Sequence, residues 1–113
     1  MNYSMSREPS GRQYINYAFY KLTNDWYQLS SLKRKNIAQK LTTILTKYDK
    51  KLTLNLYSTL GVRAECDLML WRVSDSLEIF EDMTIEMLNS GIGPYLNTIY
   101  SFLSMTKHSQ YVS

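Results

Sequence analysis

The chain has little cysteine and little histidine, and this scarcity excludes several kinds of site. Cys66 is the one cysteine and His108 the one histidine in 113 residues. A single cysteine cannot form an intramolecular disulfide, which agrees with a reducing compartment, and we interpret Cys66 as a small packed residue. It has no cysteine or histidine partner at metal-ligand spacing. His108 lies in a polar run, which favours a surface histidine over a metal ligand or an acid–base group.

Long apolar runs and common catalytic motifs are also missing. No stretch approaches the length of a membrane span, and the N-terminal residues lack the hydrophobic region of a secretory signal. We therefore expect a cytoplasmic protein without membrane association. The sequence has no His-Glu-Xaa-Xaa-His motif and no phosphate-binding glycine loop. Gly91 and Gly93 precede Pro94 and open no helix, so they indicate a helix end instead.

The composition is that of one soluble globular domain with a modest core. Apolar residues make up 44% of the 113 residues and charged residues 20%. The net charge of +3 is unevenly placed, since lysine and arginine gather in residues 33–51 and acidic residues in 75–86. We expect a basic and an acidic helix side by side, each surface ion pair contributing about 0–1 kcal/mol. This compensation argues against a nucleic-acid partner.

Apolar spacing predicts four strands and two helices. Alternating or aromatic-rich segments predict strands at 14–22, 52–57, 68–73 and 98–106. A stripe with helical spacing after Ser30 and Ser31 predicts the first helix. Its members are Leu32, Ile37, Leu41, Ile44, Leu45 and Tyr48. The second helix follows Ser74, with Asp75 and Glu78 at capping-box spacing. Its buried stripe is Leu77, Phe80, Met83, Met87 and Leu88.

The resulting order is β-α-β-β-α-β, which predicts an α+β, ferredoxin-like fold. Right-handed crossovers place both helices on one face of a four-stranded antiparallel sheet and leave the other face open. In the first strand, Ile15, Tyr17 and Phe19 share one face, and Tyr14, Asn16, Ala18 and Tyr20 share the other. We expect residues 1–13 to form a flexible arm, 14–107 the domain and 108–113 the start of a linker. The open face should be apolar and should need a second sheet to cover it.

Arg72 lies inside an otherwise apolar strand. A charge at such a position must reach solvent, a carboxylate or a ligand anion. We favour an internal ion pair or exposure at the rim over contact with a ligand.

Three segments in order resemble the chlorite dismutase and coproheme decarboxylase family. The pattern Tyr-Xaa3-Gly-Xaa-Arg/Lys-Xaa3-Asp-Leu-Xaa-Leu-Trp is met by Tyr57, Gly61, Arg63, Asp67, Leu68, Leu70 and Trp71. Residues 14–22 resemble the first strand of that family, and residues 94–111 its fourth strand and the connector beyond. The resemblance covers about residues 13–113.

The resemblance implies a chain built of two ferredoxin-like repeats whose sheets close into an α/β barrel, so that this sequence would supply half of the barrel. Haem or coprohaem would be held by the C-terminal repeat. The axial histidine and the catalytic residues of the family belong to that repeat, so we expect no catalytic or metal-ligating residue in this chain. The partner would be a C-terminal repeat or a second copy of the chain at the open face, in an oligomer.

The resemblance also suggests three cofactor-binding residues. The connector after the fourth strand lies near the porphyrin propionates in coproheme decarboxylases, and the matching residues here are Ser109, Gln110 and Tyr111. Gln110 replaces the family's asparagine. A hydroxyl or amide at these positions would donate a charge-assisted hydrogen bond to a propionate, whereas the competing interpretation is a polar linker. We assign Trp71, Tyr57, Tyr100 and Phe102 to packing.

Three functions follow from these observations. The first is the N-terminal half of a haem-dependent oxidoreductase, of the coprohaem decarboxylase or haem peroxidase type, inactive without its C-terminal half. The second is a cofactor-free ferredoxin-like dimerisation module. The third is RNA binding, which we rank last because Asp67 and the residues after it lack the basic residue and the glycine of the RNA-recognition signature.

Overall fold

A four-stranded antiparallel sheet is the centre of the fold. The computed structural model describes residues 12–58 and 66–107. Its strands are β1 (Arg12–Leu22), β2 (Thr53–Ser58), β3 (Leu68–Ser74) and β4 (Leu96–Lys107). They lie in the order β2-β3-β1-β4, and every neighbouring pair is antiparallel. The predicted α+β, ferredoxin-like arrangement is confirmed.

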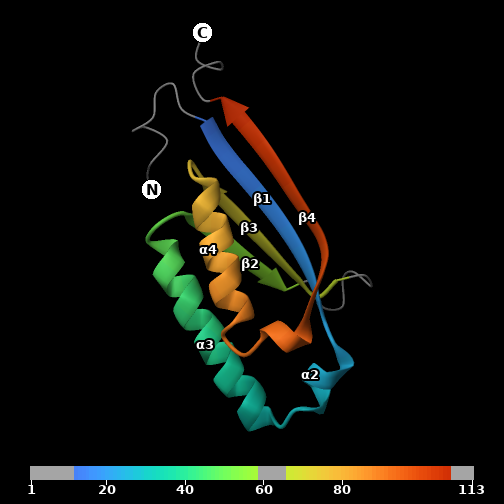
Figure 1. The fold of residues 1–113 in the computed structure, drawn as a ribbon. Coiled ribbons are helices and arrows are strands. Elements are labelled where there is room, and N and C mark those ends of the chain that lie inside the picture. Colours follow the sequence, from blue (N-terminus) through green and yellow to red (C-terminus); the bar gives the residue numbers. More distant parts are fainter. Residues whose placement is uncertain (1–11, 59–65, 108–113) are drawn as a thin grey trace.

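Two long helices cover one face of this sheet (Figure 1). They are α3 (Ser31–Asp49) and α4 (Leu77–Leu88). The predicted cap of α3 is present, because the Ser30 Oγ atom accepts a hydrogen bond from the Lys33 N–H at 3.1 Å. The predicted capping box of α4 is wrong, because the N-cap is Ser76 rather than Asp75 and makes no side-chain cap bond. Beyond α4 the chain turns at Gly91, whose φ of 109° is in the left-handed region, as the sequence predicted.

Two short helical segments were not predicted. They are α2 (Asn24–Gln28) and the 3-10 turn η1 (Gly93–Tyr95). Each is too short to show an apolar repeat in the sequence. They contact each other through Trp26 and Tyr95, whose ring centroids are 5.9 Å apart.

The core lies between the sheet and the two long helices. Ala18 and Tyr20 point toward the helices and are nearly fully buried, and they share one face of β1 as the strand alternation predicted. The helices contribute the buried side chains Leu41, Tyr48, Phe80, Met83 and Met87. Three residues of the predicted stripes are exposed instead, because they occupy helix ends. These residues are Leu32, Leu77 and Leu88.

The boundary of the first strand differs from the prediction. Arg12 and Gln13 belong to β1 rather than to the expected arm, and Gln13 is buried and pairs with Thr106 of β4. The rest of the arm, residues 1–11, and the expected linker, residues 108–113, lie outside the described residues. Of the helices in the described part of the chain, none combines the length and apolar character that crossing a membrane requires.

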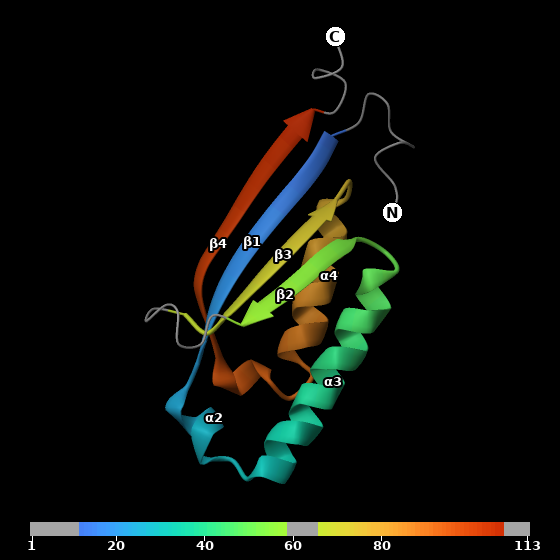
Figure 2. The ribbon, with the colours of Figure 1, turned by 180° about the vertical axis from the view of Figure 1, so that it is seen from behind.

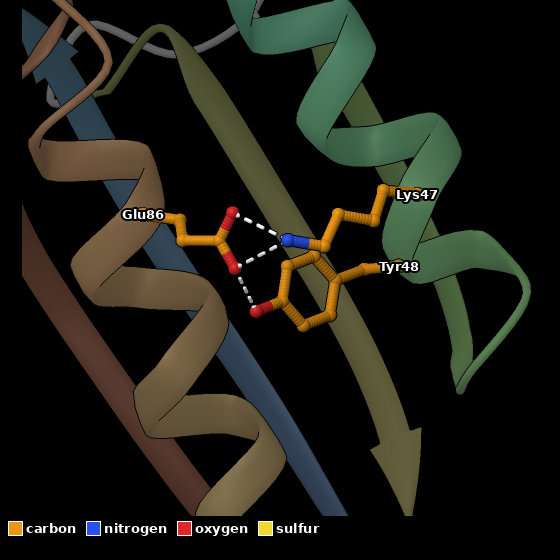
Figure 3. A network of polar contacts seen from close by, with 3 residues as sticks. All are labelled: Lys47, Tyr48 and Glu86. Atoms are coloured by element: carbon orange, nitrogen blue, oxygen red, sulfur yellow. Dashed lines mark hydrogen bonds and ion pairs between the residues drawn. The ribbon is translucent and has the colours of Figure 1, made fainter.

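One polar cluster joins the two long helices (Figure 3). The Lys47 Nζ atom lies 2.9 and 3.0 Å from the two carboxylate oxygens of Glu86. The Tyr48 hydroxyl donates a hydrogen bond to the same carboxylate. The basic and acidic helices are therefore neighbours, as their charge pattern predicted. Burial and the hydrogen bond to Glu86 raise the pKa of Tyr48 to about 12, and the hydrogen bonds from Tyr48 and Lys47 lower the pKa of Glu86.

Tyr48→Phe should reveal this cluster through the pH dependence of stability. The pKa of Tyr48 in the folded state lies above its ordinary value of 10.0. Its contribution to the free energy of unfolding is therefore complete below pH 10 and is lost as the pH rises toward 12. The folded pKa of Glu86 is lowered, so its contribution is lost as the pH falls below its ordinary value of 4.5. The difference in unfolding free energy between wild type and variant, from urea titrations, should therefore be largest between these limits.

Tyr27→Phe is the matched control, because Tyr27 is exposed and lies on α2, away from the α3–α4 contact. Its effect on unfolding free energy should stay near zero across the acid and neutral range. A Tyr48→Phe effect that did not change with pH would contradict the cluster.

Candidate functional site: the helix-free sheet face

The candidate site is the face of the sheet that carries no helix, seen from its own side in Figure 2. In antiparallel strands, directly opposed residues project to the same face. Tyr17 of β1 lies opposite Trp71 of β3 and Phe102 of β4, and Phe19 lies opposite Met69 and Tyr100. The face also holds the apolar residues Ile15, Tyr57 and Val73, and the same pairing places the polar residues Thr53, Asn55 and Ser104 on it. We call the nine apolar residues the open face.

Three rings of the open face contact one another across β1 and β4. Phe19 makes edge-to-face contacts with Tyr100 and Phe102, at centroid separations of 6.2 and 6.3 Å. Tyr100 and Phe102 stack, with centroids 5.7 Å apart and planes inclined by 24°. Such aromatic pairs stabilise a fold by about 0.5–1.5 kcal/mol more than the burial of their apolar area alone. The rings thus form a fixed apolar surface rather than independent side chains.

This surface is exposed in the chain taken alone. Tyr57, Tyr100 and Phe102 keep 48%, 50% and 54% of their area exposed. Tyr57, Tyr100 and Phe102 are outside the core between the sheet and the helices, and the ring contacts of Tyr100 and Phe102 lie within the open face. The reason is that both helices pack on the opposite side of the sheet. Contiguous exposed apolar area at about 25 cal/mol per Å² is a strong driving force for association.

A buried polar network lies on the other side of the same strands. Arg72 of β3 and Asn16 of β1 face α4 and are only 4% and 6% exposed. The Arg72 Nε and Nη2 atoms donate to the Asn16 Oδ1 atom at 3.1 and 2.6 Å. The Arg72 Nη1 atom donates to the Phe80 carbonyl and the Thr84 hydroxyl of α4, both at 3.0 Å. One guanidinium therefore connects two strands to a helix.

Asn16 extends this network to the edge strand. Its Nδ2 atom donates to the Ser101 Oγ atom and to the Phe102 carbonyl oxygen, both at 3.1 Å. The three strands β3, β1 and β4 are thus linked by side chains in addition to their ladders. The network lies directly behind the rings of β4 and fixes the backbone that carries them.

The expected ion pair or rim exposure of Arg72 is wrong. The side chain is buried, and within the described part of the chain its hydrogen-bond acceptors are an amide, a carbonyl and a hydroxyl rather than a carboxylate. Burial lowers the pKa of Arg72, and the nearby Tyr20 opposes that change. Burial raises the pKa of Tyr20, and Arg72 opposes this shift in turn. Neutral acceptors and the Phe80 ring, whose centroid is 5.1 Å from the guanidinium, stabilise the charge instead.

Asn16→Leu should destabilise the fold strongly. Leucine is close in shape to asparagine but cannot accept from Arg72, so it leaves a buried guanidinium without two of its hydrogen bonds. We expect a loss of at least about 1–3 kcal/mol in urea unfolding, the cost of leaving a buried polar group without its partner, which is larger when that group is charged.

Asn55→Leu is the matched control for this loss, because Asn55 is exposed on β2 and the same change there should alter stability by less than about 0.5 kcal/mol. Equal effects of the two changes would show that the network does not support the sheet.

Two further residues, just before β3, have structural roles. Asp67 is buried, and its Oδ2 atom accepts from the Leu22 N–H at 2.8 Å, which ties the start of β3 to the end of β1. Cys66 is 1% exposed, which agrees with the prediction of a packed cysteine. Asp67 lies between the predicted strands at 52–57 and 68–73, and its place directly before the second of these strands was the signal that the sequence analysis missed.

The sequence-predicted cofactor-binding residues belong to the segment after β4 that the structure does not describe. Ser109, Gln110 and Tyr111 lie outside the described residues, as does His108. Within residues 12–58 and 66–107, no three histidine, cysteine, aspartate or glutamate side chains form a group that could hold a metal ion. The described residues therefore supply an apolar surface and a rigid sheet.

Comparison with known proteins identifies the family. A family model described as chlorite dismutase matches residues 34–113, which is more than half of the chain. The chain belongs to the chlorite dismutase family. No curated protein shows a significant match to the sequence.

Several solved structures share the fold. A chlorite dismutase variant from Candidatus Nitrospira defluvii superposes with a TM-score of 0.78 at 18% identity, covering 96% of this chain and 47% of that one. The same enzyme in complex with imidazole gives 0.76 at 17% identity, covering 92% and 44%. A haem-binding protein from Thermus thermophilus gives 0.72 at 18% identity, covering 87% and 42%. The chain thus spans less than half the length of each of these relatives.

Proposed function

We propose that this chain is the N-terminal ferredoxin-like repeat of a chlorite dismutase-family haem protein. Its role is to supply one sheet of an α/β barrel, and a C-terminal repeat supplies the other sheet and the axial ligand of the haem iron. In the complete protein, peroxide-driven oxidative decarboxylation of coprohaem propionates is the leading chemistry, followed by peroxidase-like or chlorite-degrading activity. We place this function in the cytoplasm.

The observation that carries the proposal is the open face. Its aromatic side chains are held in place by the sheet and by the network behind it, yet they have no helix over them. A second sheet of the same kind would bury these rings. The chain covers 47% of a matched chlorite dismutase. The remaining part of that relative is long enough to form such a second layer.

The described residues include no histidine, and their one cysteine is buried, so neither of these two iron ligands is offered to a haem by the described part of the chain. They do fit the role of an apolar layer packed against a haem-binding repeat. Haem, when bound by that second repeat, would supply the redox chemistry, and this chain would exclude water from the sheet interface.

A smaller contribution to cofactor binding comes from the connector. We propose that Ser109, Gln110 and Tyr111 donate hydrogen bonds to a propionate of haem or coprohaem in the complete protein. Charge-assisted hydrogen bonds of this type are about twice as strong as neutral ones. Because they hold a carboxylate rather than the iron, they would orient the porphyrin without setting its ligation.

Titration with ferric haem and with coprohaem tests the proposal. The chain alone should give no absorption spectrum of a histidine-ligated haem, whereas the chain mixed with a C-terminal repeat of the family should give one. A tight haem complex of the isolated chain, abolished by His108→Ala, would overturn the assignment of the axial ligand to the second repeat.

The second candidate is a cofactor-free module that dimerises through the open face, and the same exposed rings favour it. Tyr17→Lys places a charge at the centre of this face, on a side chain that is 38% exposed. In sedimentation equilibrium, a colourless dimer that is indifferent to porphyrin and is dissociated by Tyr17→Lys would favour the module. A chain that takes up haem only with its C-terminal partner would reject it.

A further inference from the structure

A second apolar surface lies on the helix side of the sheet, toward the end of β4. Leu103 and Met105 oppose Asn16 and Tyr14 of β1, so these side chains project to the helix side. Leu103 and Met105 nevertheless keep 58% and 51% of their area exposed. The cause is visible in Figures 1 and 2, where β1 and β4 extend beyond the ends of the long helices. We call Tyr14, Leu103 and Met105 the outer patch.

The outer patch is separate from the open face, because the two lie on opposite sides of the same sheet. A second sheet stacked on the open face would not reach it, and strands placed beside β4 to close a barrel would not lie over it. The described helices do not cover it either, as the exposure of Leu103 and Met105 shows. The patch therefore needs another segment to bury it.

The sequence before β1 carries a pattern that fits this patch. In residues 1–6, three apolar residues alternate strictly with three polar ones, and no side chain is charged. The apolar residues are Met1, Tyr3 and Met5, and the polar ones are Asn2, Ser4 and Ser6. Such alternation predicts an extended segment with one buried side. The two charged side chains of residues 1–11, Arg7 and Glu8, both follow this segment.

The four residues directly before β1 have the composition of a chain reversal. In Glu8-Pro9-Ser10-Gly11, proline and glycine occupy the second and fourth positions, as type I turns favour. A turn centred on residues 9 and 10 would bring residue 7 level with 12, Met5 level with Tyr14, and Tyr3 level with Asn16. Tyr14 opposes Met105 and Asn16 opposes Leu103. One register therefore brings both apolar side chains to both exposed residues of β4.

We propose that residues 1–6 fold back over the helix side of β1 and β4 and bury the outer patch, with Tyr3 on Leu103 and Met5 on Met105. The length of the segment suffices. The patch lies within about 13 Å of the start of β1 at 3.3 Å per residue, and six extended residues span about 20 Å. The charges of Arg7 and Glu8 remain at the turn, in water. This proposal does not depend on the proposed function.

Two arguments select this segment over other occupants. It is covalently continuous with β1, so packing on the patch carries no cost of association between molecules. The other segment near the patch, residues 108–113, begins directly after β4 and shows no apolar alternation. A favourable contact between the Tyr3 ring and a methionine sulfur of the patch would add to the apolar burial.

Thiol labelling measures whether the patch is covered. Met105→Cys and Ile85→Cys replace residues of nearly equal exposure, 51% and 52%, and Ile85 lies on α4. In the full chain, Met105→Cys should react with a maleimide at least about 10-fold more slowly than Ile85→Cys, because its thiol is reached only when the segment opens locally. Cys66 can be retained, because it is 1% exposed.

A matched pair of changes in the segment assigns the protection. Tyr3→Asp combined with Met5→Asp places two charges on the apolar side, and should raise the labelling rate of Met105→Cys to that of Ile85→Cys. Asn2→Asp combined with Ser4→Asp adds the same charge on the polar side, and should leave Met105→Cys slow. Circular dichroism confirms that each variant is folded.

A disulfide gives a measurement that does not rely on disruption. Tyr3→Cys combined with Leu103→Cys should form a disulfide within one chain under mild oxidation at low protein concentration. Ser4→Cys combined with Leu103→Cys is the control and should remain mostly unlinked, because position 4 faces away from the sheet.

Three outcomes would overturn the proposal. One is equal labelling of Met105→Cys and Ile85→Cys in the otherwise unchanged chain. Another is protection of Met105→Cys that survives the two aspartates at positions 3 and 5, which would assign the cover to residues 108–113 or to another molecule. The last is a Tyr3→Cys, Leu103→Cys disulfide that joins two chains, which would make a second copy the donor of the segment.

Discussion

The constraint on which this structure depends is that two helices can cover only one face of its sheet. Both crossovers are on the same side, so the rings of β1, β3 and β4 on the other side have no cover within the described residues. Exposed apolar area of this kind is costly in water and drives association. The sheet topology leaves this face without a helix. The family membership and the proposed role as one layer of a barrel both agree with a second layer on it.

The sheet is held rigid from its covered side. Arg72 donates to Asn16 on β1 and to two acceptors on α4, and Asn16 reaches on to Ser101 of β4. A buried guanidinium with neutral acceptors is tolerated only when its hydrogen bonds are well satisfied. The interaction therefore fixes the relative positions of three strands. A layer that must match another sheet benefits from such fixed geometry.

The strands and the two long helices were predictable because each of them carries its own signal. The alternation in β1 separated Tyr17 and Phe19 from Ala18 and Tyr20 correctly, and Gly91 marked the end of α4. The helix ends were less predictable, because an apolar residue such as Leu32 follows the helical repeat whether or not the sheet extends beneath it.

The polar interior and the partner surfaces were the hardest to predict. No local pattern shows that the acceptors of Arg72 come from elements far apart in the sequence. The exposure of Tyr57, Tyr100 and Phe102 follows from the tertiary arrangement, since the same alternation would describe buried rings. The connector residues Ser109, Gln110 and Tyr111 rest on the family resemblance alone.

Hydroxyl-radical footprinting of the protein in its assembled form tests the central claim most directly. Tyr57 on the open face and Tyr27 on α2 have nearly equal exposure in the chain alone, 48% and 47%, so Tyr27 is an internal reference. If the open face is covered by a second layer, Tyr57 and Tyr100 should be protected while Tyr27 reacts as an exposed tyrosine. Equal reactivity of Tyr57 and Tyr27 in the assembled protein would contradict the account.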